Sequence, residues 1–299
     1  MDLSGKVAIV TGSGRGLGLA YAQRLAASGA KVVVNDADAE TAEAAVKSIG
    51  GAAVAEVAAV GSGEAAQALV DRAVGEFGRL DVLVNNAGIL RDTTLWKMTD
   101  EQFDAVITTH LRGTFTCTRA AAIQMRAADN GGRIICVGSP TGQVGNFGQT
   151  NYAAAKAGIV GMVRTWSMEL ARARITVNAI VPVAATAMTE TLPFVKPYIE
   201  ALRNGEELPP FARRELGFGP PEDAAGLVAF LASDAAADIT GQAIGVGGDR
   251  LALWSHPAEV AVEFADGTGW SADAIADVWA DRFAPSSQTV GQQLPEAPR

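Results

Sequence analysis

The sequence contains few cysteine, histidine and aromatic residues. Its 299 residues include two cysteines, Cys117 and Cys136, and two histidines, His110 and His256. Two cysteines cannot build a disulfide framework and favour a reducing compartment, so we expect a cytoplasmic protein. Neither cysteine has a His or Cys neighbour at metal-ligand spacing, so we expect no metal site.

Long hydrophobic runs and an excess of positive charge are also missing. No apolar run approaches the ~18 to 20 residues of a membrane span. Residues 1–6 lack the basic start and long apolar stretch of a signal peptide. The formal net charge is −9 and the isoelectric point is near 4.8. This charge disfavours nucleic acid and anionic membranes as partners, while a small-molecule substrate, even an anionic one, is not excluded.

Short β-branched runs alternate with alanine-rich helical stretches along most of the chain. The runs predict buried strands at 7–10, 32–34, 82–84, 134–137 and 177–180. The stretches predict helices at 17–28, 38–49, 63–76, 100–127, 152–172 and 222–232. Fully apolar strands alternating with helices indicate an α/β protein with a single doubly wound, Rossmann-type parallel sheet and helices on both faces.

Two segments interrupt this alternation. Residues 187–220 are rich in proline, glycine and charge, and we interpret them as a lid or insertion over the strand ends. The run 243–246 is predicted to be the last strand. We therefore expect a dinucleotide-binding catalytic domain over 1–250. A C-terminal extension over 251–299 would pack on the domain or on a partner subunit, with about the last 15 residues poorly ordered.

A glycine-rich loop directly follows the first predicted strand. Gly12, Gly16 and Gly18 form a G-x-x-x-G-x-G pattern that includes Arg15 and Leu17, where Leu17 occupies the last glycine position of the common G-x-G-x-x-G. Glycines let the backbone approach a pyrophosphate, and the N-terminus of the next helix attracts it. Strand, loop and helix in this order predict a dinucleotide site.

An acidic residue follows the second strand. Asp36 lies eighteen residues after Gly18 (36 − 18), close to the ~20 expected of a carboxylate that binds the adenosine ribose hydroxyls. Such a charge repels a 2′-phosphate and favours NAD over NADP. Arg15 could instead meet that phosphate, and a solvated turn aspartate is the alternative for Asp36. We predict NAD as the cofactor, with NADP disfavoured.

Tyr152 and Lys156 form a Tyr-x-x-x-Lys step, with Ser139 thirteen residues upstream (152 − 139). Residues four apart share one face of a helix. A nearby ammonium lowers the pKa of a tyrosine from its usual ~10. The resulting phenolate could take a proton from an alcohol while hydride leaves the same carbon. The step alone is a weak signal, because an arbitrary match lies on an ordinary helix.

The glycine loop, Asn86, Ala87, Gly88, Ser139 and the Tyr152/Lys156 step together resemble the short-chain dehydrogenase/reductase family, over about residues 3–248. The resemblance implies that Tyr152 is the catalytic acid/base and that Ser139 bonds the substrate oxygen. It implies that Lys156 holds the nicotinamide ribose, and that 86–88 pass along the adenosine half of the cofactor. It also implies a homodimer or homotetramer.

Residues 86–92, 110–115 and 145–152 resemble more closely the dehydrogenase unit of peroxisomal multifunctional enzyme type 2, a group that includes 17β-hydroxysteroid dehydrogenase type 4. This implies NAD-dependent oxidation of a 3-hydroxyacyl-CoA, of a fatty acid or a sterol side chain, to a 3-ketoacyl-CoA. The alternatives are a 17β-hydroxysteroid dehydrogenase, an NADPH-dependent ketoacyl reductase and a non-catalytic NAD(H)-binding redox sensor. The complete Ser139, Tyr152 and Lys156 set argues against the sensor.

Four positions depart from the family pattern. His110 stands where an asparagine usually helps hold a proton-relay water, so it either takes that role or is an ordinary buried histidine. Pro182 is followed by valine instead of glycine. Thr186 comes one residue earlier than the family's threonine, which the resemblance implies meets the nicotinamide amide or the phosphates. Ala58 replaces an aspartate that binds adenine. Candidate cations for CoA phosphates are Arg91, Lys97, Arg112, Lys196, Arg203, Arg213 and Arg214.

Overall fold

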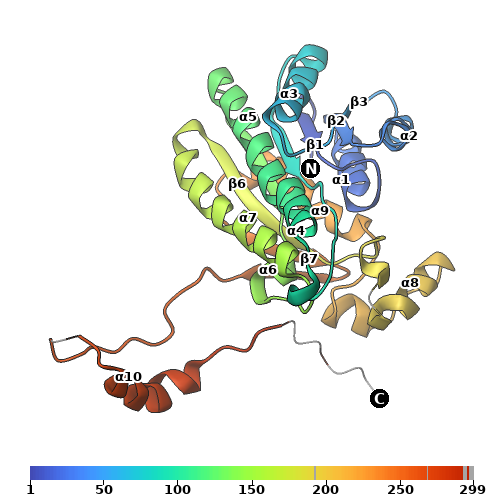
Figure 1. The fold of residues 1–299 in the computed structure, drawn as a ribbon. Helices are drawn as coiled ribbons and strands as arrows, with labels where there is room; N and C mark the ends of the chain where they lie inside the picture. Colours follow the sequence, from blue (N-terminus) through green and yellow to red (C-terminus); the bar gives the residue numbers. More distant parts are fainter. Residues whose placement is uncertain (192, 268, 292–294, 296–299) are drawn as a thin grey trace.

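The protein is an eight-stranded sheet with helices on both faces (Figure 1). The computed structural model describes residues 1–191, 193–267, 269–291 and 295. The strand order is β3-β2-β1-β4-β5-β6-β7-β8, and only the β7–β8 pair is antiparallel. The predicted doubly wound parallel sheet is therefore confirmed. The strands are β1 Val7–Val10, β2 Lys31–Asp36, β3 Ala53–Val57, β4 Val82–Asn85, β5 Gly132–Val137, β6 Ile175–Pro182, β7 Ala243–Gly247 and β8 Arg250–Trp254.

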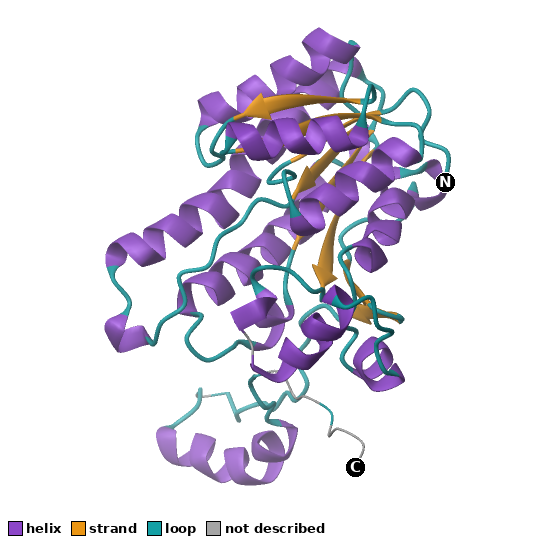
Figure 2. Cartoon of the chain, turned by 90° about the vertical axis from the view of Figure 1, so that its right-hand side faces the viewer, coloured by secondary structure: helices purple, strands orange, loops and turns teal. Residues whose placement is uncertain are grey.

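Both faces of the sheet are covered, which explains the fully apolar central strands (Figure 2). One core cluster contains Tyr21 and Leu25, and the other contains Leu69, Met125 and Ile159. Side chains of one strand alternate between these clusters, so a strand buried on both faces needs no polar positions. The helices are α1 Gly16–Ala27, α2 Ala39–Ile49, α3 Gly63–Phe77, α4 Asp100–Val106, α5 Gly113–Ala128, α6 Pro140–Val144, α7 Thr150–Glu169, α8 Lys196–Arg203, α9 Glu222–Ala232 and α10 Ala272–Val278.

The helix predicted over 100–127 is interrupted. A π-helical turn at Ile107–Arg112 separates α4 from α5. A Cβ on Gly113 at the junction would lie 3.0 Å from Cγ2 of Val60, so glycine suits this close approach. The wider turn carries His110, which is buried against the sheet side of the helix pair. Such turns are frequent at functional sites.

The prediction that 243–246 is the last strand is wrong. The chain reverses at Gly248, where φ is +50°, and β8 pairs antiparallel with β7. Leu251 and Leu253 are each 69% exposed, while Ala252 and Trp254 are partly buried. This half-exposed alternation is typical of an edge strand. The first residues of the predicted extension therefore belong to the sheet.

The segment predicted as a lid folds as a small layer of short helices around α8. It has its own core of five apolar residues, Val195, Ile199, Leu208, Ala212 and Phe218. Arg213 fastens this layer to the body, pairing with Asp223 at 3.1 Å and with Asp249 at 2.6 Å. Closure over a substrate remains a prediction for this segment.

Beyond β8 the chain projects from the body as an arm that carries α10 (Figure 1). The arm returns to the body where the Gly291 N–H donates to the Val144 carbonyl at 2.7 Å. Several large apolar side chains on the arm are exposed, including Phe264 at 86% and Trp279 at 55%. Poor order was predicted for the last 15 residues. Of these, residues 292–294 and 296–299 lie outside the described part.

Candidate active site

The glycine-rich loop joins β1 to α1 and is shaped for close approach. Gly12 and Gly16 have φ of +59° and +57°, where side chains are strained. A Cβ on Gly12 would lie 2.7 Å from the Ala87 Cα, and one on Gly18 would clash with the Gly12 carbonyl. Arg15 precedes α1 and makes no side-chain capping bond, so the helix N–H groups are available to an anion. The loop fits a pyrophosphate.

Thr11 holds the end of β4 against this loop. Its Oγ1 accepts from the N–H groups of Asn86 at 2.9 Å and Ala87 at 3.1 Å. The Asn86 amide in turn donates to the carbonyls of Thr11 at 3.0 Å and Gly12 at 2.9 Å. The structure therefore brings Asn86 and Ala87 beside the phosphate loop, through a threonine that the prediction did not single out. Contact of 86–88 with the adenosine half of the cofactor stays a prediction.

Asp36 lies at the end of β2, facing the same loop. Its Oδ2 accepts from the Gly14 N–H at 3.3 Å. Its neighbour Asn35 is buried and accepts from the Gly12 N–H at 3.3 Å while donating to the Ala58 carbonyl at 2.9 Å. Asn35 thereby ties the end of β2 to the loops after β1 and β3 and supports the position of Asp36.

Thr186 also lies near the loop. A Cβ on Gly16 would stand 4.0 Å from the Thr186 Cγ2, with no closer neighbour. The Thr186 N–H donates to Thr189 Oγ1 at 2.8 Å, which fixes the turn after β6. Pro182 ends β6, and the following N–H, of Val183, donates to the Val246 carbonyl. These positions suit contact with the phosphates.

Ser139, Tyr152 and Lys156 meet at the carboxyl ends of β5 and β6. Ser139 caps α6, and its Oγ accepts from the Thr141 N–H at 3.2 Å. Lys156 is 3% exposed and donates to the Val137 carbonyl at 2.5 Å. Its Nζ lies over the Tyr152 ring, 5.5 Å from the centroid. Burial lowers the pKa of Lys156 to about 7.

The predicted lowering of the Tyr152 pKa is not found in the protein alone. Burial raises the pKa of Tyr152 above its usual value, the hydrogen bond with Ser139 opposes this, and the charge of Asp92 adds to it. A phenolate loses hydration in a buried site, so desolvation outweighs the hydrogen bond. The sequence identified a favourable neighbour but could not show how much water the fold removes from the partly buried tyrosine.

His110 stands beside the same tyrosine. The two rings meet edge to face, with centroids 5.1 Å apart. The His110 Nε2 lies 3.0 Å from the Ile89 nitrogen and 2.8 Å from the Ile89 oxygen, and its tautomer decides which it bonds. Its Nδ1 is buried and has no partner among the described residues. Burial, assisted by the charge of Lys156, lowers the pKa of His110 to about 3, so the ring is neutral.

The family follows from comparison with known proteins. A sequence model of the family described as short chain dehydrogenase matches residues 6–193, more than half of the chain. The chain belongs to the short chain dehydrogenase family. It is therefore an oxidoreductase with a nicotinamide cofactor, which the phosphate loop fits.

Individual relatives support the resemblance seen in the sequence. A 3-oxoacyl-[acyl-carrier-protein] reductase of Synechocystis is 45% identical over 83% of this chain and 98% of that reductase. The hydroxyacyl-CoA dehydrogenase ChsB1 of Mycobacterium tuberculosis is 42% identical over 95% of this chain and 90% of that protein. Peroxisomal multifunctional enzyme type 2 of Drosophila melanogaster is 46% identical over 62% of this chain and 32% of that enzyme. The predicted likeness to these groups is confirmed.

The fold of this short chain dehydrogenase also matches a solved structure. A crystal structure of a short chain dehydrogenase from Mycobacterium avium gives a TM-score of 0.82 at 36% identity, covering 97% of this chain and 98% of that one. Within the described ranges, no helix is long and apolar enough to cross a membrane. Over the same ranges, no three His, Cys, Asp or Glu side chains gather as a metal site.

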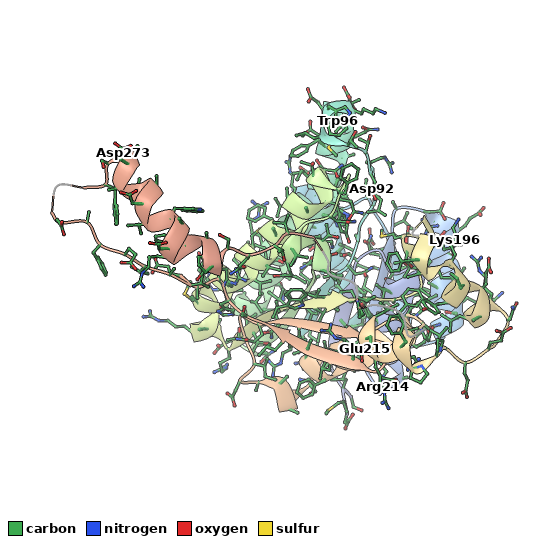
Figure 3. The ribbon with its side chains drawn as sticks, turned by 90° about the horizontal axis from the view of Figure 1, so that it is seen from below. Asp92, Trp96, Lys196, Arg214, Glu215 and Asp273 are labelled. Atoms are coloured by element: carbon green, nitrogen blue, oxygen red, sulfur yellow. The ribbon has the colours of Figure 1, made fainter. Side chains whose placement is uncertain are left out.

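The positively charged residues of the lid differ in whether they form ion pairs within the chain. Arg213 is held by two aspartates, and Arg203 pairs with Glu190 at 2.6 Å, so both are engaged within the chain. Lys196 and Arg214 form no ion pair among the described residues and lie on the lid (Figure 3). They are the better lid candidates for a phosphate.

Replacing His110 by asparagine, the usual family residue, is expected to make this dehydrogenase less sensitive to acid. The pKa of His110 is about 3 folded and about 6.5 unfolded, so below pH 6.5 only the unfolded chain gains this proton. Stability therefore falls as pH falls through this window, by about 2 kcal/mol at pH 5. Urea unfolding at pH 7.5 and pH 5.0 should show a loss about 2 kcal/mol smaller in His110→Asn.

The matched control is His256→Asn, because His256 is exposed. It should lose the same stability on acidification as the unchanged protein. An equal loss in His110→Asn would mean that His110 is protonated in the folded state at pH 5.

Proposed function

We propose that the protein is an NAD-dependent dehydrogenase that interconverts a secondary alcohol and a ketone, with 3-hydroxyacyl-CoA thioesters as substrates. The observation that carries this proposal is the meeting of Ser139, Tyr152 and Lys156 in one site, with Ser139 and Lys156 buried and the Lys156 Nζ over the Tyr152 ring. The relative named hydroxyacyl-CoA dehydrogenase supports the substrate class, because its likeness extends over 95% of the chain and so includes the arm.

The residues of the chain suit a reversible proton transfer at the carbinol oxygen. Ser139 would donate to that oxygen or accept from it, and the Tyr152 oxygen would take its proton. The bound nicotinamide supplies the hydride acceptor. Lys156, with its positive charge at the Tyr152 ring, would stabilise the phenolate. The unpartnered Nδ1 of His110, next to that ring, could hold a relay water and so take the role of the usual asparagine.

The preference for NAD rests on Asp36. Its carboxylate faces Gly14, where an adenosine ribose would lie in this fold, and a 2′-phosphate would meet a like charge. Arg15 is exposed and forms no bond to Asp36 among the described contacts. Hydrogen bonds from Thr41, with a smaller contribution from Arg15, lower the pKa of Asp38, so Arg15 acts on the next acidic residue.

A second candidate is a ketoacyl reductase that runs the same chemistry towards the alcohol. The 45% identity to a reductase of acyl-carrier-protein thioesters favours it. The two functions share Ser139, Tyr152 and Lys156 and differ in the thioester carrier and the direction of hydride transfer.

A substrate panel decides between them. The expected result is NAD reduction with 3-hydroxyacyl-CoA substrates of several chain lengths, at a kcat/KM at least about tenfold above that for a 17β-hydroxysteroid. Activity confined to NADPH and acyl-carrier-protein thioesters would establish the reductase instead. Turnover of steroids alone would overturn both.

Assembly and location belong to the same proposal. The exposed apolar side chains of the arm, such as Phe264 and Trp279, need a covering surface, so we propose a homodimer or homotetramer whose arms pack on partner subunits. Light scattering of the intact chain should give the mass of two or four subunits, and a monomer would contradict this.

The free, buried cysteines Cys117 and Cys136 agree with a cytoplasmic protein.

A further inference from the structure

A network of side chains joins the two catalytic segments through Gln149, which lies just before α7. The Gln149 Nε2 donates to Asp92 Oδ2 at 2.7 Å. Its Oε1 accepts from Thr141 Oγ1 at 3.1 Å and from Asn146 Nδ2 at 3.0 Å. All donors and acceptors of this amide except one N–H are therefore engaged, which fixes its orientation.

This network bonds the Ser139 side chain and, through the backbone, the helix that carries Tyr152. The Thr141 N–H donates to Ser139 Oγ, and the Gln149 carbonyl accepts from Ala153 in the first turn of the helix that carries Tyr152. The Thr93 N–H donates to the Gly148 carbonyl at 2.9 Å, so the loop after Asp92 is held to the same segment. Asp92 is thereby fixed beside the segments that carry Ser139 and Tyr152, at the base of the projection that carries Trp96 (Figure 3).

The Asp92 carboxylate is exposed, and among the described residues it forms no ion pair. Its neighbour Arg91 turns to the Leu90 carbonyl at 2.7 Å. The loss of water on its partly covered side raises the pKa of Asp92, and the bond from Gln149 opposes that rise. The charge acts on Tyr152, whose other polar neighbours are Ser139, His110 and Lys156.

We propose that Asp92 is a charge filter that makes the site reject substrates with a carboxylate near the reacting carbinol and accept neutral thioesters. This inference rests on the proposed function. In a free 3-hydroxy acid the carboxylate carbon lies two bonds from the carbinol carbon, about 2.5 Å away. It would share the surroundings of Tyr152 and repel Asp92. A thioester carbonyl at the same place is neutral, and the phosphates of CoA lie much farther away.

The test compares two small substrates with the same carbinol, racemic ethyl 3-hydroxybutyrate, which is a neutral ester, and racemic 3-hydroxybutyrate, which is a carboxylate. 3-Hydroxybutyryl-CoA is assayed in parallel. The unchanged protein should prefer the ester. In Asp92→Asn the ester-to-acid ratio of kcat/KM should fall about tenfold, as expected for two partly screened charges. Asp104→Asn is the matched control, since Asp104 is exposed on α4 and has no bonded partner among the described contacts.

The pH profile supplies a readout that lost packing would not change. A nearby negative charge raises the pKa of a tyrosine, so Asp92→Asn should lower that of Tyr152. Oxidation needs the phenolate, so the rising limb of kcat/KM should move to lower pH. It should stay in place in Asp104→Asn.

The outcomes separate the two proposals. An unchanged ratio and an unmoved limb in Asp92→Asn, with thioester turnover intact, would overturn the charge filter. In a second outcome, the ester-to-acid ratio of kcat/KM falls in Asp92→Asn, but neither this variant nor the unchanged protein oxidises the CoA thioester. That result would overturn the proposed function and leave the charge filter in place.

Discussion

Tyr152→Phe is expected to lower kcat for alcohol oxidation at least about a thousandfold while NAD still binds. The substitution removes only the oxygen that would take the carbinol proton, and general acid–base groups contribute about 10²- to 10⁴-fold. The ring that Lys156 and His110 contact remains. Stopped-flow single turnovers would show the loss in the chemical step, and fluorescence titration would show NAD binding within about threefold of the unchanged protein.

The chain offers a matched control for this change. Tyr21 is fully buried, and its hydroxyl has no partner among the described residues, so Tyr21→Phe removes an oxygen that bonds nothing. It should keep full activity and gain slightly in stability. If Tyr152→Phe also kept its activity, the proton would go elsewhere and the proposed mechanism would be wrong.

The sheet was predictable because its central strands are buried on both faces. Val7–Val10 reads as apolar throughout, and it is β1 without any change of boundary. The edge strand β8 escaped prediction for the opposite reason. Half of its residues face solvent, and its pairing depends on a tight turn at Gly248 that only the fold reveals. Whether a strand could be predicted from the sequence depended on how fully it is buried, more than on the β-propensity of its residues.

In the site, contacts between residues close in the sequence were predictable, and contacts between residues far apart in the sequence were not. Tyr152 and Lys156 are one helical turn apart, so spacing predicts their neighbourhood. Asp92 and Gln149 are 57 residues apart, and no periodicity joins them. Burial is likewise a property of the whole fold. That is why the pKa of Tyr152 is raised where the sequence predicted a lowered value, and why the low pKa of His110 was not foreseen.

Asp36→Asn is expected to change the ratio of NADP to NAD affinity by about a hundredfold in favour of NADP. Asparagine keeps the shape and can still accept from the Gly14 N–H, so the loop keeps its geometry. The lost charge weakens bonds to the ribose hydroxyls, where a charged acceptor contributes about 1.5 to 3 kcal/mol. It also removes repulsion of a 2′-phosphate, which Arg15 is then free to attract. Dissociation constants from calorimetry with both cofactors measure the ratio.

Glu40→Gln removes the same charge four residues further along the chain, where Glu40 is exposed in the first turn of α2. It should leave the ratio within about threefold, because an exposed charge at that distance is screened. A ratio that shifted equally in both variants would mean that the net charge of the region, and not the Asp36 contact, selects the cofactor. An unchanged ratio in Asp36→Asn would remove the main reason to favour NAD, and the reductase reading would then be the stronger one.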